Sequence, residues 1–196
     1  MSNNGWRTVK LGEIATIVMG QSPKSEYYNY SGEGMAFFQG CKEFGEYFPV
    51  VEKFCTKPTR LAPANSILMS VRAPVGKLNM ANQECCIGRG LCSIIAKDGN
   101  TRFIYYLLSE FGSELQKKST GTTYDSINKN DLHNTEFVVP PKEIIERITD
   151  AMQNYDLLIQ NNSKRIDSLE ESAKRLYQEW VVKFRFPGHE NVPMVD

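Results

Sequence analysis

The most regular hydrophobic pattern of this 196-residue chain lies in its last quarter, where apolar residues recur at alternating steps of three and four. The pattern continues for about five heptads, and its only polar position is Asn162. A repeat of this length predicts a long α-helix with one apolar stripe, which needs a partner helix to cover it. We call this stripe the seam. Its positions are Ile145, Ile148, Met152, Tyr155, Ile159, Asn162, Ile166, Leu169, Ala173, Leu176 and Trp180, and we expect helix pairing from Tyr155 onward.

Asn162 leaves two interpretations open. A buried Asn between two helices costs stability, but it fixes their register when it meets a polar group of the partner. Alternatively, the helices diverge at this position and the side chain is solvated.

The first 140 residues carry short apolar runs separated by Gly, Pro, Asn and Asp, which predicts a β-rich, mixed domain. Residues 20–34 are rich in Gly, Ser, Asn, Pro and Tyr without periodicity, and this favours a long loop. Asn100 or Thr101 can cap a helix over 102–116. The other expected elements are strands at 36–39, 67–71, 91–96 and 137–139, and a short helical turn that opens 11–18.

The boundary between the two parts lies at Val139-Pro140-Pro141. Proline restricts the preceding residue to extended conformations and suits the first turn of a helix. The predicted fold class is therefore α+β, with a globular domain over 1–140 and a long helix over 141–186. Phe186-Pro187-Gly188 should stop the helix, so 187–196 is expected to be a flexible tail.

Charge is informative only after the chain is divided. The whole chain has 23 basic and 23 acidic residues. Residues 53–102 contain eight basic and two acidic residues, a net charge of +6, whereas 1–52 and 103–140 each sum to −2. This basic middle favours an anionic partner such as nucleic acid, although a solvated surface gives the same composition.

The composition points away from metal sites and catalysis. Five cysteines without a CxxC pair, and only two histidines, predict no metal site and free, mostly buried thiols in a reducing compartment. No apolar run reaches membrane-spanning length and the polar start is unlike a signal peptide, so we expect a cytoplasmic protein without a membrane anchor. There is no phosphate-binding loop, and Ile87-Gly88-Arg89-Gly90 lacks the third glycine of a dinucleotide fingerprint. We therefore expect no catalytic residue and no bound cofactor.

Several short motifs, taken in order, resemble one half of a specificity subunit of a type I restriction-modification system. The resemblance extends over nearly the whole chain. Full specificity subunits usually contain two recognition domains and two long helices, so the chain resembles either a natural half-subunit or the front half of a longer protein. The segments that carry the resemblance are Leu11-Gly12-Glu13-Ile14, Ile67-Leu68-Met69-Ser70-Val71-Arg72-Ala73-Pro74, Ile87-Gly88-Arg89-Gly90-Leu91, Gly121-Thr122-Thr123, Val139-Pro140-Pro141 and Phe184-Arg185-Phe186-Pro187-Gly188.

The resemblance implies a non-catalytic, sequence-specific DNA-binding subunit. Its target recognition domain would bind one half of a bipartite site on double-stranded DNA. Its helix would form an antiparallel coiled coil, with a second copy if the chain is a natural half-subunit. The helices would also dock modification subunits, which methylate adenine with S-adenosylmethionine, and the restriction subunit would associate indirectly. The alternative is a coiled-coil scaffold or assembly protein without DNA recognition.

Candidate DNA contacts come from the basic middle and from loops rich in hydroxyl and amide groups. Arg72 and Arg89 have the geometry to bind guanine, and Gln39 to bind adenine, although arginines within motifs also suit structural ion pairs. Phosphate neutralisation is expected from Lys57, Arg60, Arg72, Lys77 and Arg89. The loop candidates are Lys24, Tyr27, Tyr28, Ser119, Thr120, Thr122, Thr123 and Tyr124.

Overall fold

A computed structural model describes residues 5–118 and 126–191, with only the backbone described for 113–118. The chain divides into two compact units, Met1–Arg147 and Ile148–Asp196. The first unit holds all of the strands that the structure describes, and the long helix begins in it. The fold is therefore α+β, as predicted.

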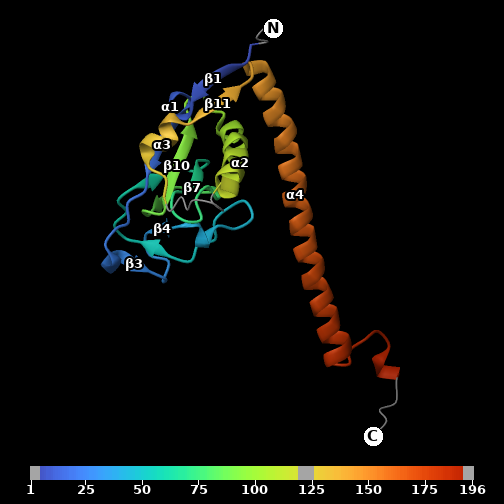
Figure 1. The fold of residues 1–196 in the computed structure, drawn as a ribbon. Helices are drawn as coiled ribbons and strands as arrows, with labels where there is room; N and C mark the ends of the chain where they lie inside the picture. Colours follow the sequence, from blue (N-terminus) through green and yellow to red (C-terminus); the bar gives the residue numbers. More distant parts are fainter. Residues whose placement is uncertain (1–4, 119–125, 192–196) are drawn as a thin grey trace. The chain divides into compact units, whose positions relative to one another are not determined.

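A four-stranded antiparallel sheet forms the centre of the first unit. Its order is β2 (Ala15–Met19), β10 (Leu91–Ala96), β7 (Ile67–Ser70) and β8 (Leu78–Met80). The strands expected at 67–71 and 91–96 are confirmed. Helix α2 (Thr101–Lys118) lies beside β10 (Figure 1), and Ile104 and Leu108 join the main hydrophobic core. Asn100 caps α2, because its Oδ1 accepts a hydrogen bond of 3.2 Å from the Phe103 amide.

A second, five-stranded sheet has the order β3-β5-β4-β9-β6. Strands β4 and β9 are parallel, whereas the other neighbours are antiparallel. Strand β4 confirms the strand expected at 36–39, with its end one residue earlier. The bounds of the five strands are β3 (Tyr28–Asn29), β4 (Met35–Phe38), β5 (Phe54–Cys55), β6 (Leu61–Ala62) and β9 (Cys85–Ile87).

The long loop expected at 20–34 is partly wrong. This stretch contains a 3-10 turn, η1 (Ser25–Tyr27), followed by strand β3. Tyr28 pairs with Cys55 and Asn29 with Phe54, so β3 is stabilised by a segment more than twenty residues away. A two-residue strand has too few positions for an alternating pattern, which is why local periodicity could not indicate it.

Strands β1 (Arg7–Lys10) and β11 (Glu136–Val139) pair at the end of the unit away from β3 and β4 (Figure 1). Helices α1 (Leu11–Ile14) and α3 (Lys129–Asn134) lie next to this pair. The glycine of the Leu11-Gly12 motif has a structural reason, because any Cβ at Gly12 would collide with the ring of His133. The strand at 137–139 and the helical turn at the start of 11–18 are confirmed.

Helix α4 (Lys142–Tyr177) continues into a π-helical turn, η3 (Gln178–Val182), so the long helix is confirmed. Regular helix ends at Val182, before the Phe186-Pro187-Gly188 segment that was expected to stop it. Phe184 adopts a left-handed conformation with φ of 53°, and this residue turns the chain out of the helix. A further 3-10 turn, η4, occupies His189–Asn191 in the region expected to be a flexible tail.

The seam is exposed from Ile148 to Trp180. Tyr155 is 66% exposed, Ile166 55% and Leu169 68%, values far above those of core residues. Leu157 and Leu158, which lie outside the seam, are exposed by 44% and 56%, so the role of the seam in helix pairing stays a prediction. Across the ranges that the structure describes, no helix combines the length and apolar character needed to cross a bilayer.

Candidate DNA-binding surface

A tight turn between β9 and β10 positions the best-defined candidate residues. The Gly88 amide donates to the Phe38 carbonyl at 2.8 Å, and the Gly90 amide donates to the Gln39 carbonyl at 3.1 Å. A Cβ at Gly90 would lie 2.5 Å from the Gln39 carbonyl oxygen, and one at Gly88 would lie 3.0 Å from the Gln39 Cα. Both glycines of this motif are therefore needed for close backbone packing, and Arg89 between them projects to the surface.

Arg89, Gln39 and Tyr28 line one depression of about 570 Å³, together with Gln21, Ser22, Pro23 and Ser25. The amide of Arg89 donates to the Ser22 hydroxyl oxygen at 3.2 Å, which joins the β9–β10 turn to the loop before η1. Among the described residues, no salt bridge involves Arg72 or Arg89. The described part of the chain therefore gives no support to the structural ion pairs considered for these arginines.

Tyr28 is held rigidly at the edge of this depression. Its ring stacks on Phe37 with centroids 4.7 Å apart, and its hydroxyl donates to the Pro23 carbonyl at 2.7 Å. Burial, with smaller contributions from the Cys55 and Cys86 thiols, raises the pKa of Tyr28. The hydroxyl is thus protonated at neutral pH, and its oxygen can still accept a hydrogen bond.

Two lysine ammonium groups lie close to tyrosine rings next to the depression. The ammonium of Lys57 lies 4.6 Å from the ring centroid of Tyr27, and that of Lys53 lies 5.6 Å from Tyr28 and 5.8 Å from Tyr30. A cation over an aromatic face is attracted by the ring quadrupole, so both ammonium groups have preferred positions. They remain able to contact phosphate, because neither is paired with a carboxylate among the described residues.

The other basic candidates lie on loops connected to the same turn. The Arg60 carbonyl accepts from the Ile87 amide at 2.9 Å, and the neighbouring Thr59 hydroxyl donates to the Gln21 carbonyl. The Val71 amide donates to the Gly90 carbonyl at 2.9 Å. Arg72 is the residue after Val71, so its backbone lies beside the turn that carries Arg89. The Arg60, Arg72 and Arg89 side chains are all exposed.

Lys24 and Lys77 are not among the residues that line the depression around Arg89. Lys24 is exposed and lies 3.9 Å from Glu26. Lys77 is exposed at the far end of the β7–β8 turn, where its amide donates to the Ser70 hydroxyl oxygen at 2.9 Å. The remaining loop candidates, Ser119, Thr120, Thr122, Thr123 and Tyr124, lie outside the described residues.

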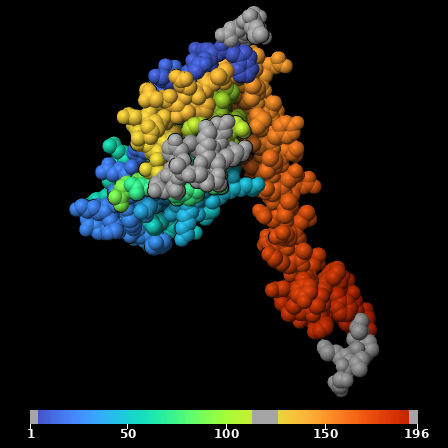
Figure 2. All heavy atoms as spheres, in the orientation of Figure 1, coloured from blue at the N-terminus to red at the C-terminus, as the bar shows by residue number. Residues whose placement is uncertain are grey.

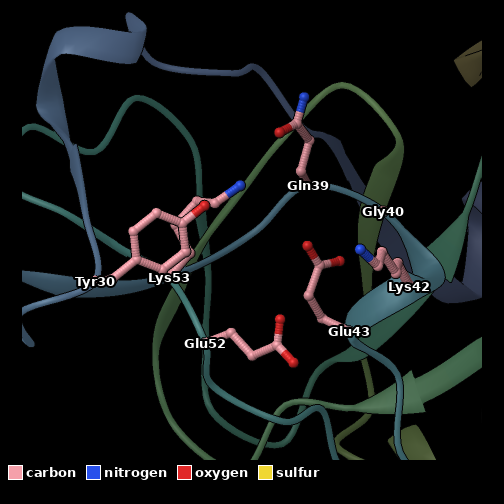
Figure 3. A pocket seen from close by; sticks show the side chains of 7 residues that line it. All are labelled: Tyr30, Gln39, Gly40, Lys42, Glu43, Glu52 and Lys53. Carbon is pink, nitrogen blue, oxygen red and sulfur yellow. The ribbon is translucent and has the colours of Figure 1, made fainter.

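A second pocket, of about 360 Å³, shares Gln39 with the first and is lined by Tyr30, Gly40, Lys42, Glu43, Glu52 and Lys53. Figure 3 shows the Glu43 and Glu52 carboxylates projecting into this space. The Oε2 atom of Glu43 is buried without a hydrogen-bond partner among the described residues.

Sequence reasoning missed Tyr30 and Lys53. Tyr30 is 75% exposed, and the loop that carries it is fixed by Asn29, whose Oδ1 accepts from the Ser31 and Glu33 amides at 3.2 and 3.0 Å. The local run Tyr27-Tyr28-Asn29-Tyr30 was the signal that could have indicated it, since Asn favours such turns. In Figure 2 the blue and cyan atoms of this part of the chain form one continuous end of the first unit.

The five cysteines are free thiols, as predicted. Cys55, Cys85, Cys86 and Cys92 are buried, whereas Cys41 is half-buried. Burial raises the pKa of both Cys85 and Cys92 to about 12. In the described ranges no three or more His, Cys, Asp or Glu side chains gather in a way that could hold a metal ion.

Comparisons with known proteins point to one family. The family model described as "Type I restriction modification DNA specificity domain" matches residues 3–171. A Methanocaldococcus jannaschii protein, proposed to be the specificity subunit of the type I restriction enzyme MjaX, is 35% identical over 175 residues, which cover 87% of this chain and 41% of that protein. This chain spans half or less of the length of the curated relatives it matches.

Two solved structures share the fold. The HsdS subunit from Thermoanaerobacter tengcongensis has a TM-score of 0.70 and 37% identity, and the match covers 94% of this chain and 46% of that one. A chain from a structure that describes complex assembly and conformational transition of a type I restriction-modification system has a TM-score of 0.71 and 40% identity, covering 89% and 44% of the respective chains.

Proposed function

This chain belongs to the family of type I restriction-modification DNA specificity domains, and from that membership we propose that residues 1–140 form a target recognition domain. The domain binds one half of a bipartite target on double-stranded DNA. The observation that carries this proposal is the convergence of Arg89, Gln39 and Tyr28 around one depression, with Lys57 and Arg60 on the adjoining loops.

The chemistry of this surface suits DNA in two ways. Exposed cations neutralise phosphates and release counterions, which gives affinity that falls as salt is added. Arg89 and Gln39 carry the planar donor and acceptor groups that distinguish guanine and adenine in the major groove. The Gly90 amide, next to Arg89, donates to the Gln39 carbonyl, so the backbone segments that carry the two side chains are held together before DNA binds.

The long helix provides assembly. We propose that residues 141–186 pair antiparallel with a second copy and dock modification subunits, which methylate adenine with S-adenosylmethionine in the cytoplasm. The restriction subunit then joins through the modification subunits. In this scheme the chain itself contributes specificity and no catalytic group, and residues 187–196 follow the helix as a tail.

Selection from a random pool of duplexes, with modification subunits present, tests the proposal. We expect enrichment of one short sequence and an affinity that decreases steeply with salt. Arg89→Ala should weaken binding to the selected site by about 5- to 150-fold and relax the preference at one base pair, as for loss of a bidentate base contact.

Arg7→Ala is the matched control, because Arg7 is an exposed arginine on β1, at the opposite end of the unit. It should leave the selected sequence and the affinity unchanged. If no sequence is enriched at any salt concentration, the proposal that this domain recognises a DNA sequence is wrong. The exposed seam would then favour a coiled-coil scaffold without DNA recognition.

A further inference from the structure

The pocket of about 360 Å³ beside the depression contains two carboxylates, Glu43 and Glu52, which binding to phosphate does not require. We infer that Glu43 determines specificity, because its carboxylate accepts a hydrogen bond from the exocyclic amino group of one base in the half-site. The inference rests on the DNA recognition proposed above, and it adds the chemical group of the target that one residue selects. The position of the pocket, its unpaired charges and the surroundings of the Glu43 carboxylate carry it.

The pocket adjoins the depression around Arg89. Gln39 lines both of them. Lys53 lines the pocket and Tyr28 lines the depression, and the Lys53 ammonium lies 5.6 Å from the centroid of the Tyr28 ring. A duplex that contacts Arg89 and Gln39 therefore also lies at the pocket.

Four charged side chains line the pocket, and the structure pairs none of them with a group of opposite charge. Lys42 and Glu52 are exposed, whereas Glu43 and Lys53 are partly buried. Among the described residues, no salt bridge involves any of the four. Charges that are partly buried without partners cost free energy, so such a group is typical of a site that gains its partners on binding.

The Glu43 carboxylate is held in place without a hydrogen-bond donor. Glu43 ends the 3-10 turn η2 (Cys41–Glu43), and its backbone carbonyl accepts from the Val50 amide at 2.8 Å. Its Oε2 atom is buried, whereas Oε1 is not, and neither oxygen accepts a hydrogen bond from a described residue. Figure 3 shows the carboxylate directed into the pocket. The fold thus fixes the position of an acceptor, and a ligand in the pocket can supply the donor.

The donors that a DNA duplex presents limit what this carboxylate can bind. A carboxylate accepts hydrogen bonds, and it repels phosphate. In the major groove, cytosine and adenine present an amino group, whereas guanine and thymine present acceptors at the corresponding positions. Glu43 should therefore favour cytosine or adenine at one position of the half-site and disfavour guanine and thymine there.

Base replacement in the selected half-site, measured for the native chain and for Glu43→Gln, tests the assignment. At one position, replacing cytosine or adenine by thymine or guanine should weaken binding by the native chain about 5- to 150-fold. The same replacement should affect Glu43→Gln much less, because an amide both donates and accepts. Affinity of this variant for unrelated DNA should not fall, since it has one negative charge fewer, whereas a variant with a damaged fold would lose affinity for every sequence.

Base analogues identify the amino group. A pyrimidinone in place of cytosine, or unsubstituted purine in place of adenine, removes the amino group and leaves the rest of the base in the duplex. One of these two replacements should weaken binding by the native chain and leave binding by Glu43→Gln nearly unchanged.

Two further variants separate the pocket from general effects of charge. Glu84→Gln removes the same charge from an exposed glutamate that lines neither the pocket nor the depression, so it should keep the base preference. Gly40→Leu should fill the pocket and reduce the preference at the same position as Glu43→Gln. No heavy atom lies within 4 Å of a Cβ at Gly40, and its φ of −162° is extended, so the fold should accept leucine there. Circular dichroism checks the fold of each variant.

A native chain and a Glu43→Gln variant with equal losses at every position would overturn the inference. An effect confined to Glu52→Gln would also overturn it, because the other carboxylate of the pocket would then be the acceptor. If Glu43→Gln did not fold, a Gly40→Leu variant with an unchanged base preference would have the same meaning. Each of these results leaves a selected sequence and the role of Arg89 intact, whereas failure to select any sequence would contradict the proposed function itself.

Discussion

At the scale of single residues, two glycines determine where the candidate base contacts lie. Gly88 and Gly90 let the β9–β10 turn pack against the backbone of Gln39, and the Gly90 amide holds the Gln39 carbonyl. Base recognition requires side chains placed to within a fraction of an ångström. In the Gly88-Arg89-Gly90 turn the two glycines therefore have a structural role, whereas the exposed Arg89 side chain is available for binding.

Gly90→Ala tests this division. The new Cβ would lie 2.5 Å from the Gln39 carbonyl oxygen, so the two backbones must move apart. We expect a loss of unfolding free energy of about 1–3 kcal/mol, as for other overpacked sites. Affinity for the selected DNA should fall because the positions of both Arg89 and Gln39 change. Denaturant unfolding and DNA titration of the variant measure the two effects. Gly99→Ala serves as a control for binding, since no heavy atom lies within 4 Å of a Cβ at that position, although its φ of 86° adds backbone strain.

The buried thiols make the stability depend on alkaline pH. Burial raises the pKa of Cys92 in the folded state to about 12 from an ordinary value of 9.0, so the folded protein retains a proton that the unfolded chain loses. Stability from this effect is complete below pH 9 and is lost as the pH rises towards 12. Cys92→Ala should thus show a smaller decrease in unfolding free energy between pH 8.5 and about pH 10.5 than the native chain. Equal pH dependence of the two proteins would show that Cys92 contributes nothing to it.

At the scale of secondary-structure elements, the sequence predicted those strands and helices whose hydrophobic pattern is local. Strands β7 and β10 are short apolar runs between turn residues, α2 has a helical stripe with Asn100 at its start, and α4 has the heptad seam. Each signal lies within the element itself, so a single sequence is enough to detect it.

The second sheet and the candidate site depend on contacts between distant segments. Strand β3 exists because it pairs with β5, and the β9–β10 turn is fixed by Gln39, about fifty residues earlier. Residue type alone indicated that Arg89 and Gln39 were candidates, but not that they line one depression. It also could not indicate Tyr30 and Lys53, whose exposure and mutual position follow from the Asn29 turn and the packing of β3 against β5.

At the scale of the whole molecule, the proposed pairing through the seam predicts a dependence of DNA affinity on the helix. A dimer that holds two recognition domains binds an inverted repeat of half-sites, and the second contact is intramolecular once the first has formed. Affinity for two half-sites should then exceed that for one half-site by far more than the factor of two expected from having two sites. The gain requires a spacer that brings both half-sites to the two domains together.

Changing the spacer tests this linkage. Adding about five base pairs rotates the second half-site by about half a turn of B-DNA, so the native dimer should lose most of the gain. Leu169→Glu places a charge in the seam at a position that is 68% exposed in the single chain, and should yield monomers that bind both spacers equally and weakly. Ser168→Glu adds the same charge at the neighbouring exposed position outside the seam, and it should retain both the dimer and the spacer dependence. Light scattering and DNA titration measure the two properties on the same samples. If the Leu169→Glu monomer kept the spacer dependence, the two DNA contacts could not arise from pairing through α4, and the helix would have another role.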